Sequence, residues 1–158
     1  MTKQICILGC DPGASGAIAF YFPAHPELIA VEDVPTVNGE IDSAQLGARI
    51  LQMKPDLAMV EQVGAMPKQG VSSTFKFGDA FGQLKGVLGA LQVPRHMVTP
   101  AKWKKHFRLD SDKEAARALA IRLWPSCENF QRKKDHGRAE AALIARYCAE
   151  IILREQGE

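Results

Sequence analysis

Residues 5–16 read ICILGCDPGASG, and this stretch decides which fold we expect for the chain. Its first four residues form a continuous apolar run, which is typical of a buried strand, and Asp11-Pro12-Gly13 then predicts a tight turn. A second run of high β propensity, residues 15–22, follows after so short a link that the two runs predict a hairpin. Residues 28–34 predict a third strand, which Pro35 ends.

Beyond this point helices and strands are expected to alternate. Ser43 is expected to cap a helix that runs to about Met53, and residues 56–62 predict a short buried strand ending in Glu61. Residues 64–74 predict a mobile surface loop, because they are rich in Gly, Ser and Pro and have no periodicity.

The second half of the chain predicts a further strand and four helices. We expect a helix over 77–91, a strand over 94–98, a short helix capped by Thr99, a helix capped by Ser111 that stops at Pro125, and a last helix over 137–155. Five strands with βα units after the first three predict an α/β fold, in which helices flank a mixed five-stranded sheet. At 158 residues we expect one domain, spanning 1–158.

The composition is that of an ordinary globular protein. It is 46% hydrophobic and 24% charged, which argues against a disordered chain, a collagen-like chain and a disulfide scaffold. No apolar run approaches the roughly 20 residues that a membrane span needs, and the N-terminus lacks the features of a signal peptide. The four cysteines lack zinc-site spacing, so we expect reduced thiols and a cytoplasmic location.

Positive charge is concentrated in residues 95–138, which hold twelve Lys or Arg against five Asp or Glu. The rest of the chain has an excess of acidic residues. Such an asymmetry is typical of a protein that binds a polyanion, although solvated helix faces explain it equally well.

Three acidic residues stand at the ends of predicted elements. Asp11 follows the first strand, Glu61 ends the strand over 56–62, and Glu140 lies among small apolar residues near the start of the last helix. A carboxylate at the end of a buried strand costs solvation energy unless it binds something. His136 lies four residues before Glu140 and shares its face if that turn is helical. Such residues suit hard divalent cations, although a turn-forming Asp and an exposed linker His are the open alternatives.

Three motifs, in this order, resemble RuvC-type Holliday-junction resolvases: ILGCDPG at 7–13 with Ser15-Gly16, MVEQ at 59–62, and GRAEAAL at 137–143. The stretch QGVSSTFKFG at 69–78 resembles the DNA-binding loop and helix start of the phage and bacterial branches. The resemblance implies an RNase H-like fold, a homodimer, and cleavage of branched DNA such as four-way junctions. It also implies a two-metal-ion mechanism with Mg²⁺, for which Mn²⁺ can substitute.

The sequence departs from this family at the last helix. The family commonly brings two ligands from that helix, three residues apart, but Gly137 occupies the position three before Glu140. His136 is the candidate fourth ligand, because a spacing of four still keeps one helical face. Asp135, five residues before Glu140, stays open as the alternative. The catalytic and metal-binding set implied by the resemblance is Asp11, Glu61, His136 and Glu140.

Candidate DNA-binding residues are basic or aromatic. Phe75, in a polar loop, is expected to stack on unpaired bases, whereas Phe77 and Trp103 fit a core pattern. The lysines expected to reach phosphates are Lys68, Lys76, Lys85, Lys102, Lys104 and Lys105.

Two other functions compete with a nuclease. A sugar-kinase or actin-like ATP-binding protein needs two such domains, and the sequence has no phosphate-binding GxxxxGK[ST] loop. A junction-binding protein without catalysis stays open, although retention of all three acids argues against it. Gly78, Gly82, Gly86 and Gly89 form one helix face, which is expected to pack in a dimer or against the sheet or last helix of the same chain.

Overall fold

A computed structural model describes residues 4–156, so residues 1–3 and 157–158 of the expected domain lie outside the described part. Its centre is a five-stranded sheet in the order β3-β2-β1-β6-β7. The strands are β1 (Ile7–Asp11), β2 (Ala17–Tyr21), β3 (Ile29–Asp33), β6 (Leu57–Glu61) and β7 (Arg95–Val98). β1, β2 and β3 run antiparallel, whereas β6 and β7 run parallel to β1. The predicted mixed α/β sheet is therefore confirmed.

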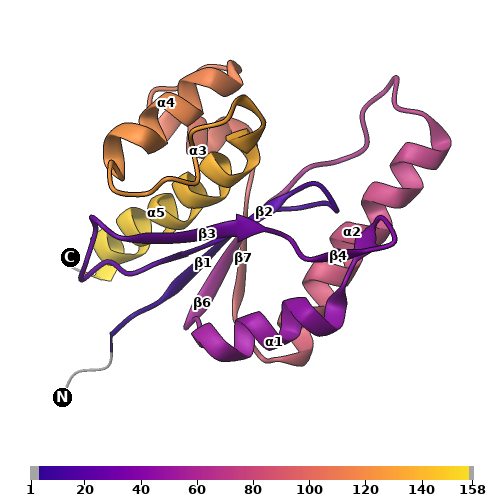
Figure 1. The fold of residues 1–158 in the computed structure, drawn as a ribbon, viewed down its shortest axis with the longest axis horizontal. Coiled ribbons are helices and arrows are strands. Elements are labelled where there is room, and N and C mark those ends of the chain that lie inside the picture. Colours follow the sequence, from indigo (N-terminus) through magenta and orange to yellow (C-terminus); the bar gives the residue numbers. More distant parts are fainter. Residues whose placement is uncertain (1–3, 157–158) are drawn as a thin grey trace.

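Helices cover both faces of this sheet (Figure 1). On one face lies α5 (His136–Gln156), with α3 (Pro100–His106) and α4 (Lys113–Leu123) on the same side. On the other face lie α1 (Ser43–Met53) and α2 (Val71–Ala90). Because neighbouring strand residues point to opposite faces, β1 sends Ile7 into the core beneath α5, and Leu8 and Cys10 into the core beneath α1 and α2.

Gly9 allows the α5 backbone to approach β1 very closely. A Cβ atom at Gly9 would lie 2.3 Å from the carbonyl oxygen of Ala141 and 2.8 Å from the Cβ of Ala145. No side chain fits into this space, so glycine on the strand and alanine on the helix set the separation of the two elements. The residues at the end of β1 and at the start of α5 are thereby held near each other.

α2 begins earlier than the sequence predicts. The helix starts at Val71 with Gly70 as its N-cap, so the prediction of a loop through residue 74 is wrong for its last four residues. Thr74 donates its backbone N–H to Gly70, which shows that the serine and threonine residues here extend the helix instead of ending it. The N-terminal end of α2 and the loop before it project from the body of the molecule (Figure 1).

The glycine face of α2 packs against nothing in the described part of the chain. Its buried side chains are Ala80, Leu84 and Leu88, whereas a Cβ added at any of Gly78, Gly82, Gly86 or Gly89 would have no heavy atom within 4 Å. Packing of this face against the sheet or the last helix of the same chain is therefore excluded, because the glycines point the opposite way from the buried stripe.

Smaller differences lie at turns and caps. A hairpin of β4 (Thr36–Val37) and β5 (Glu40–Ile41) follows Pro35, with Asn38 and Gly39 at positive φ in its turn. The N-cap of α1 is Asp42, one residue before the expected Ser43, and the N-cap of α4 is Asp112, one residue after the expected Ser111. In both helices the aspartate carboxylate accepts a free backbone N–H of the first turn. The link before the last helix forms a 3₁₀ turn, η1 (Lys133–Asp135). Among the described residues, no helix is both long and apolar enough to cross a membrane.

Candidate metal centre

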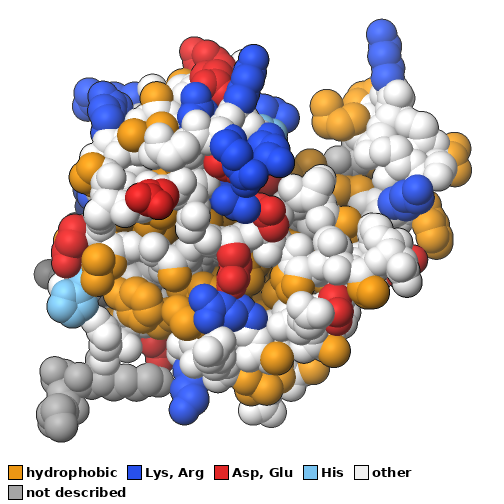
Figure 2. Space-filling view, viewed as in Figure 1, with side chains coloured by type: hydrophobic (Ala, Val, Ile, Leu, Met, Phe, Trp, Pro, Cys, Tyr) orange, Lys and Arg blue, Asp and Glu red, His pale blue; other side chains and the backbone are white. Residues whose placement is uncertain are grey.

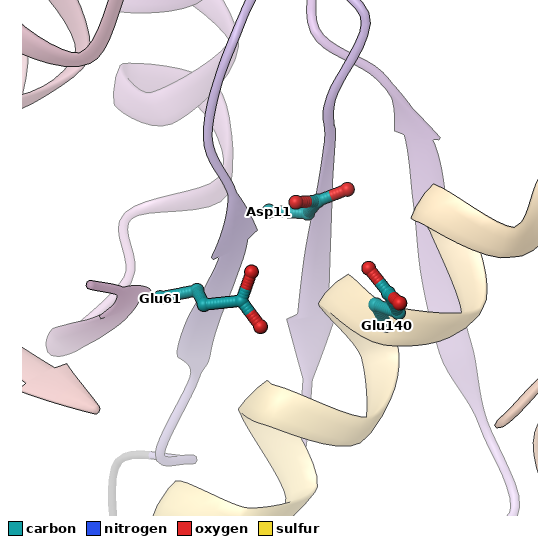
Figure 3. A group of neighbouring side chains, drawn as sticks. All are labelled: Asp11, Glu61 and Glu140. Carbon is teal, nitrogen blue, oxygen red and sulfur yellow. The ribbon is translucent and has the colours of Figure 1, made fainter. Parts of the chain in front are cut away.

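Asp11, Glu61 and Glu140 come together at one edge of the sheet. Asp11 and Glu61 are the last residues of the adjacent strands β1 and β6, and Glu140 follows the first turn of α5. One carboxylate oxygen from each residue lies within 4.8 Å of one from each of the other two. Figure 3 shows the three side chains pointing toward one another from these two strands and the helix. Their predicted convergence is confirmed, and we call them the carboxylate cluster.

The carboxylate cluster is buried, and its members repel one another. Glu61 and Glu140 are only 6% and 8% exposed, and Asp11 is partly buried. Burial raises the pKa of Asp11 well above its usual value, and the charges of Glu140 and Glu61 raise it further. Burial also raises the pKa of Glu61 and of Glu140. Three carboxylates that are buried or partly buried and repel one another are a donor set that suits a hard cation such as Mg²⁺.

Two lysines supply the nearby positive charge. The charge of Lys104 on α3 acts to lower the pKa of all three carboxyl groups, and that of Lys113 at the start of α4 acts in the same way on Asp11 and Glu140. Burial has the larger effect, so each pKa stays raised overall. Lys104 was among the predicted DNA-binding residues, but Lys113 was missed. Its only signal in the sequence was its place in the basic stretch, directly after a helix cap.

Trp103 makes a direct hydrogen bond to the carboxylate cluster. Its indole N–H donates to Oε2 of Glu61 at 2.7 Å, and the whole side chain is buried. The prediction that Trp103 is a core residue is confirmed, but the sequence did not reveal this bond. A buried indole must find an acceptor for its one donor, and that requirement was the available signal.

Neither Asp135 nor His136 belongs to the carboxylate cluster. Asp135 accepts hydrogen bonds from the backbone and guanidinium of Arg132 and pairs with Arg138; burial alone would raise its pKa, but these contacts lower it. Burial lowers the pKa of His136, and Lys113 lowers it further. Its ring Nδ1 is buried without a hydrogen-bond partner among the described residues. A role for His136 as a ligand stays a prediction.

Gly137 is the residue of α5 that lies against Asp11. A Cβ atom at Gly137 would stand 3.0 Å from Oδ2 of Asp11. The position three residues before Glu140 therefore faces the carboxylate cluster, but here it carries no side chain that could be a ligand.

The predicted DNA-binding residues fall on two separate parts of the surface. Lys68, Phe75 and Lys76 lie on the projecting loop and first turns of α2, where the Phe75 side chain is 76% exposed. Phe77 is half-buried and stacks on Phe81 but belongs to neither hydrophobic core, so its predicted core position is not confirmed. Lys85 lies over the same Phe81 ring.

The second part of the surface is built by α3 and the start of α4. Lys102, Lys104 and Lys105 lie on α3, and the last two of these line a pocket of about 750 Å³ together with Arg108. Figure 2 shows Lys and Arg side chains gathered on the side of the molecule where α3 and α4 lie. The same view shows hydrophobic and basic side chains on the projecting end of α2. The surface at the projecting end of α2 thus combines positive charge with exposed apolar groups.

Solved structures share this architecture. Thermus thermophilus RuvC in complex with a Holliday junction substrate matches with a TM-score of 0.70 and 17% identity, covering 94% of this chain and 96% of that one. The chain has the RuvC fold. A second Thermus thermophilus RuvC structure matches with a TM-score of 0.61 and 16% identity, covering 93% and 96%. The yeast mitochondrial Holliday junction resolvase Ydc2 matches at 0.59 and 17%, covering 95% and 83%.

No protein-family model and no curated protein sequence matches this chain. The likeness is therefore one of backbone architecture at low sequence identity. The RNase H-like fold expected from the motifs is confirmed, and the chemistry has to be argued from the residues of this chain.

Proposed function

We propose that this protein is a metal-dependent endonuclease that cleaves phosphodiester bonds in branched DNA, such as four-way junctions. The observation that carries the proposal is the carboxylate cluster, placed at the strand ends of a RuvC fold. No observation of this kind favours an actin-like ATP-binding function, and the sequence has no phosphate-binding GxxxxGK[ST] loop.

Asp11, Glu61 and Glu140 would hold the divalent cations, with Mg²⁺ as the physiological ion and Mn²⁺ as a substitute. Two such ions supply an activated water and stabilise the leaving oxygen in phosphodiester cleavage. The three carboxylates must lose their protons before they bind a cation, and Lys104 and Lys113 help them do so by favouring the charged form. His136 remains the candidate for a fourth ligand.

DNA would bind across both basic surfaces. Lys102, Lys104 and Lys105 would contact phosphates beside the carboxylate cluster, and Lys68, Lys76 and Lys85 would do so along α2. Phe75 is exposed at the projecting end, where it can stack on a base that a junction leaves unpaired. Linear duplex offers no such base, and this difference would provide selectivity for branched DNA.

The active enzyme would be a homodimer acting on DNA in the cytoplasm. Symmetric resolution of a four-way junction needs two cuts, and the described residues of one chain form a single carboxylate cluster. The open glycine face of α2 is the surface we assign to the second copy. Sedimentation with junction DNA at micromolar protein should give a dimer; a monomer would count against paired cutting.

Cleavage assays test the proposed function. A synthetic four-way junction and a linear duplex of the same sequence are incubated with the protein and Mg²⁺, Mn²⁺ or EDTA. We expect cleavage of the junction alone, and only with a metal. Equal cutting of the linear duplex, or cutting in EDTA, would contradict the proposal.

Variants extend the same assay. Asp11→Asn should abolish cleavage and leave junction binding largely intact, because affinity comes mostly from phosphate contacts. Asp33→Asn, which removes an exposed carboxylate paired with Arg138, is the matched control and should keep activity. Wild-type protein that binds junctions tightly but never cuts them would instead indicate a junction-binding protein.

A further inference from the structure

We propose that Trp103 is a positioning residue that orients Glu61 for metal binding through its indole N–H. This inference rests on the proposed metal-dependent function of the carboxylate cluster. Trp103 is completely buried and so is not placed to contact DNA, and its indole N–H, which can only donate a hydrogen bond, cannot be a metal ligand.

The fold brings Trp103 to Glu61 by a short and well-defined path. β7 pairs with β6 in parallel, with Val98 opposite Glu61, and Gln62 donates its backbone N–H to Val98 at 2.7 Å. α3 follows at once, with Thr99 as its N-cap and Pro100 as its first residue. One turn later Trp103 lies beside the end of β6, because only the N-cap residue Thr99 separates the strand from the helix.

The indole is held in place on its far side as well. Trp103 is completely buried in the core beneath α5, where Ala139 and Leu143 of that helix belong to the same core. At the end of α3, His106 contacts the carboxylate of Glu150 on α5 and lies edge-on to Tyr147, with 5.1 Å between the ring centroids. α3 is thus fixed to the helix that carries Glu140, so the donor of Trp103 has little freedom to move.

The hydrogen bond determines how Glu61 presents its oxygens. With Oε2 bound to Trp103, the carboxylate cannot turn freely about its last bond, and Oε1 is left without that constraint. A hydrogen bond to a charged carboxylate in a buried site is strong and short. Partners of this kind fix metal ligands, and their loss typically weakens metal binding by about 10- to 100-fold.

Trp103→Phe tests the proposal, with Trp124→Phe as the matched control. Trp124 is the only other tryptophan, is also completely buried, and donates its indole N–H to the carbonyl of Pro26 at 3.0 Å. Each variant loses one buried donor and a similar ring volume, so both should lose comparable thermal stability. Mn²⁺ binding to DNA-free protein, measured by calorimetry, should weaken by about 10-fold or more in Trp103→Phe and less than 2-fold in Trp124→Phe.

An isosteric replacement removes any doubt about packing. In the Trp124→Phe background, Trp103 is the only tryptophan, so a tryptophan auxotroph can replace it with β-(3-benzothienyl)alanine, in which sulfur takes the place of the N–H. The same loss of Mn²⁺ affinity is expected here. Unchanged affinity in both Trp103 replacements would overturn the proposal.

Junction cleavage tests the proposed nuclease function, whereas Mn²⁺ affinity tests the role of Trp103. Wild-type protein that binds Mn²⁺ but cuts no junction would reject the nuclease function, and the comparison of the two tryptophans would still decide the role of Trp103. Wild-type protein that binds no Mn²⁺ would overturn both.

Discussion

Asp11→Asn should make the metal-free protein more stable, although it removes a residue that we expect to be essential for cleavage. The substitution removes two of the three repulsions within the carboxylate cluster. Two unit charges 4.8 Å apart repel by about 3 kcal/mol at an effective dielectric constant of about 20. The raised pKa of each carboxyl relieves part of this repulsion by proton uptake. We therefore expect a net gain of about 1–3 kcal/mol near pH 8.

Thermal melting in EDTA and in Mg²⁺ measures this effect. For a protein of this size, the gain corresponds to a Tm about 2–10 °C above that of the wild type in EDTA. Saturating Mg²⁺ should reverse the order, because a ligand at about 1,000 times its Kd stabilises the folded state by about 4.1 kcal/mol and only the wild type keeps the whole site. Asp33→Asn, which breaks the ion pair with Arg138, should lower the Tm slightly under both conditions. A lower Tm for Asp11→Asn than for the wild type in EDTA would refute the electrostatic argument.

Three further outcomes are expected. Phe75→Ala should reduce junction cleavage far more than duplex binding and should leave the Tm within about 1 °C, because the side chain is 76% exposed; a large fall in Tm would mean that Phe75 is a core residue. Gly9→Ala should destabilise the protein by about 3 kcal/mol or more in urea denaturation, since its Cβ would lie 2.3 Å from a backbone oxygen. Gly82→Ala, with open space around it, should instead raise the free energy of unfolding by up to about 1 kcal/mol. Equal effects of the two substitutions would show that the packing of Gly9 is misjudged. The stability of the metal-free protein should fall as the pH rises, because the pKa values of Asp11 and Glu61 are raised in the folded state. The stability that these carboxyl groups contribute is fully present below the usual pKa values, 3.8 for Asp and 4.5 for Glu. It is lost as the pH rises from there through the raised pKa values. Urea denaturation of the wild type relative to Asp11→Asn, from about pH 5 to 8, measures this dependence, and a difference independent of pH would contradict it.

The edge of the sheet was predictable from the sequence because strand ends are local features. An apolar run followed by Asp11, and another ending in Glu61, are enough to place two carboxylates at adjacent strand termini. Glu140 was predictable from its isolation among small apolar residues near a helix start.

Other parts of the site depend on pairings between distant segments. The bond from Trp103 to Glu61 follows from the register of β6 with β7, which no short-range pattern specifies. The missed helical turns at the start of α2 have polar residues and exposed apolar ones, so they lack the periodicity that burial imposes. The spacing rule placed His136 on the face of Glu140, but in the structure Gly137 is the residue against Asp11.

The close packing of α5 on the first strands has a consequence for the order of synthesis. β1 and β2 leave the ribosome early, and among the described elements α5 is the last. Until α5 emerges, the sheet face that carries Ile7 and Tyr21 lacks the helix that packs on β1 and β2, and Asp11 has no Glu140 beside it. A nascent chain therefore cannot assemble the carboxylate cluster before α5 is made, so the proposed cleavage activity would arise only after that helix has emerged and packed on the sheet.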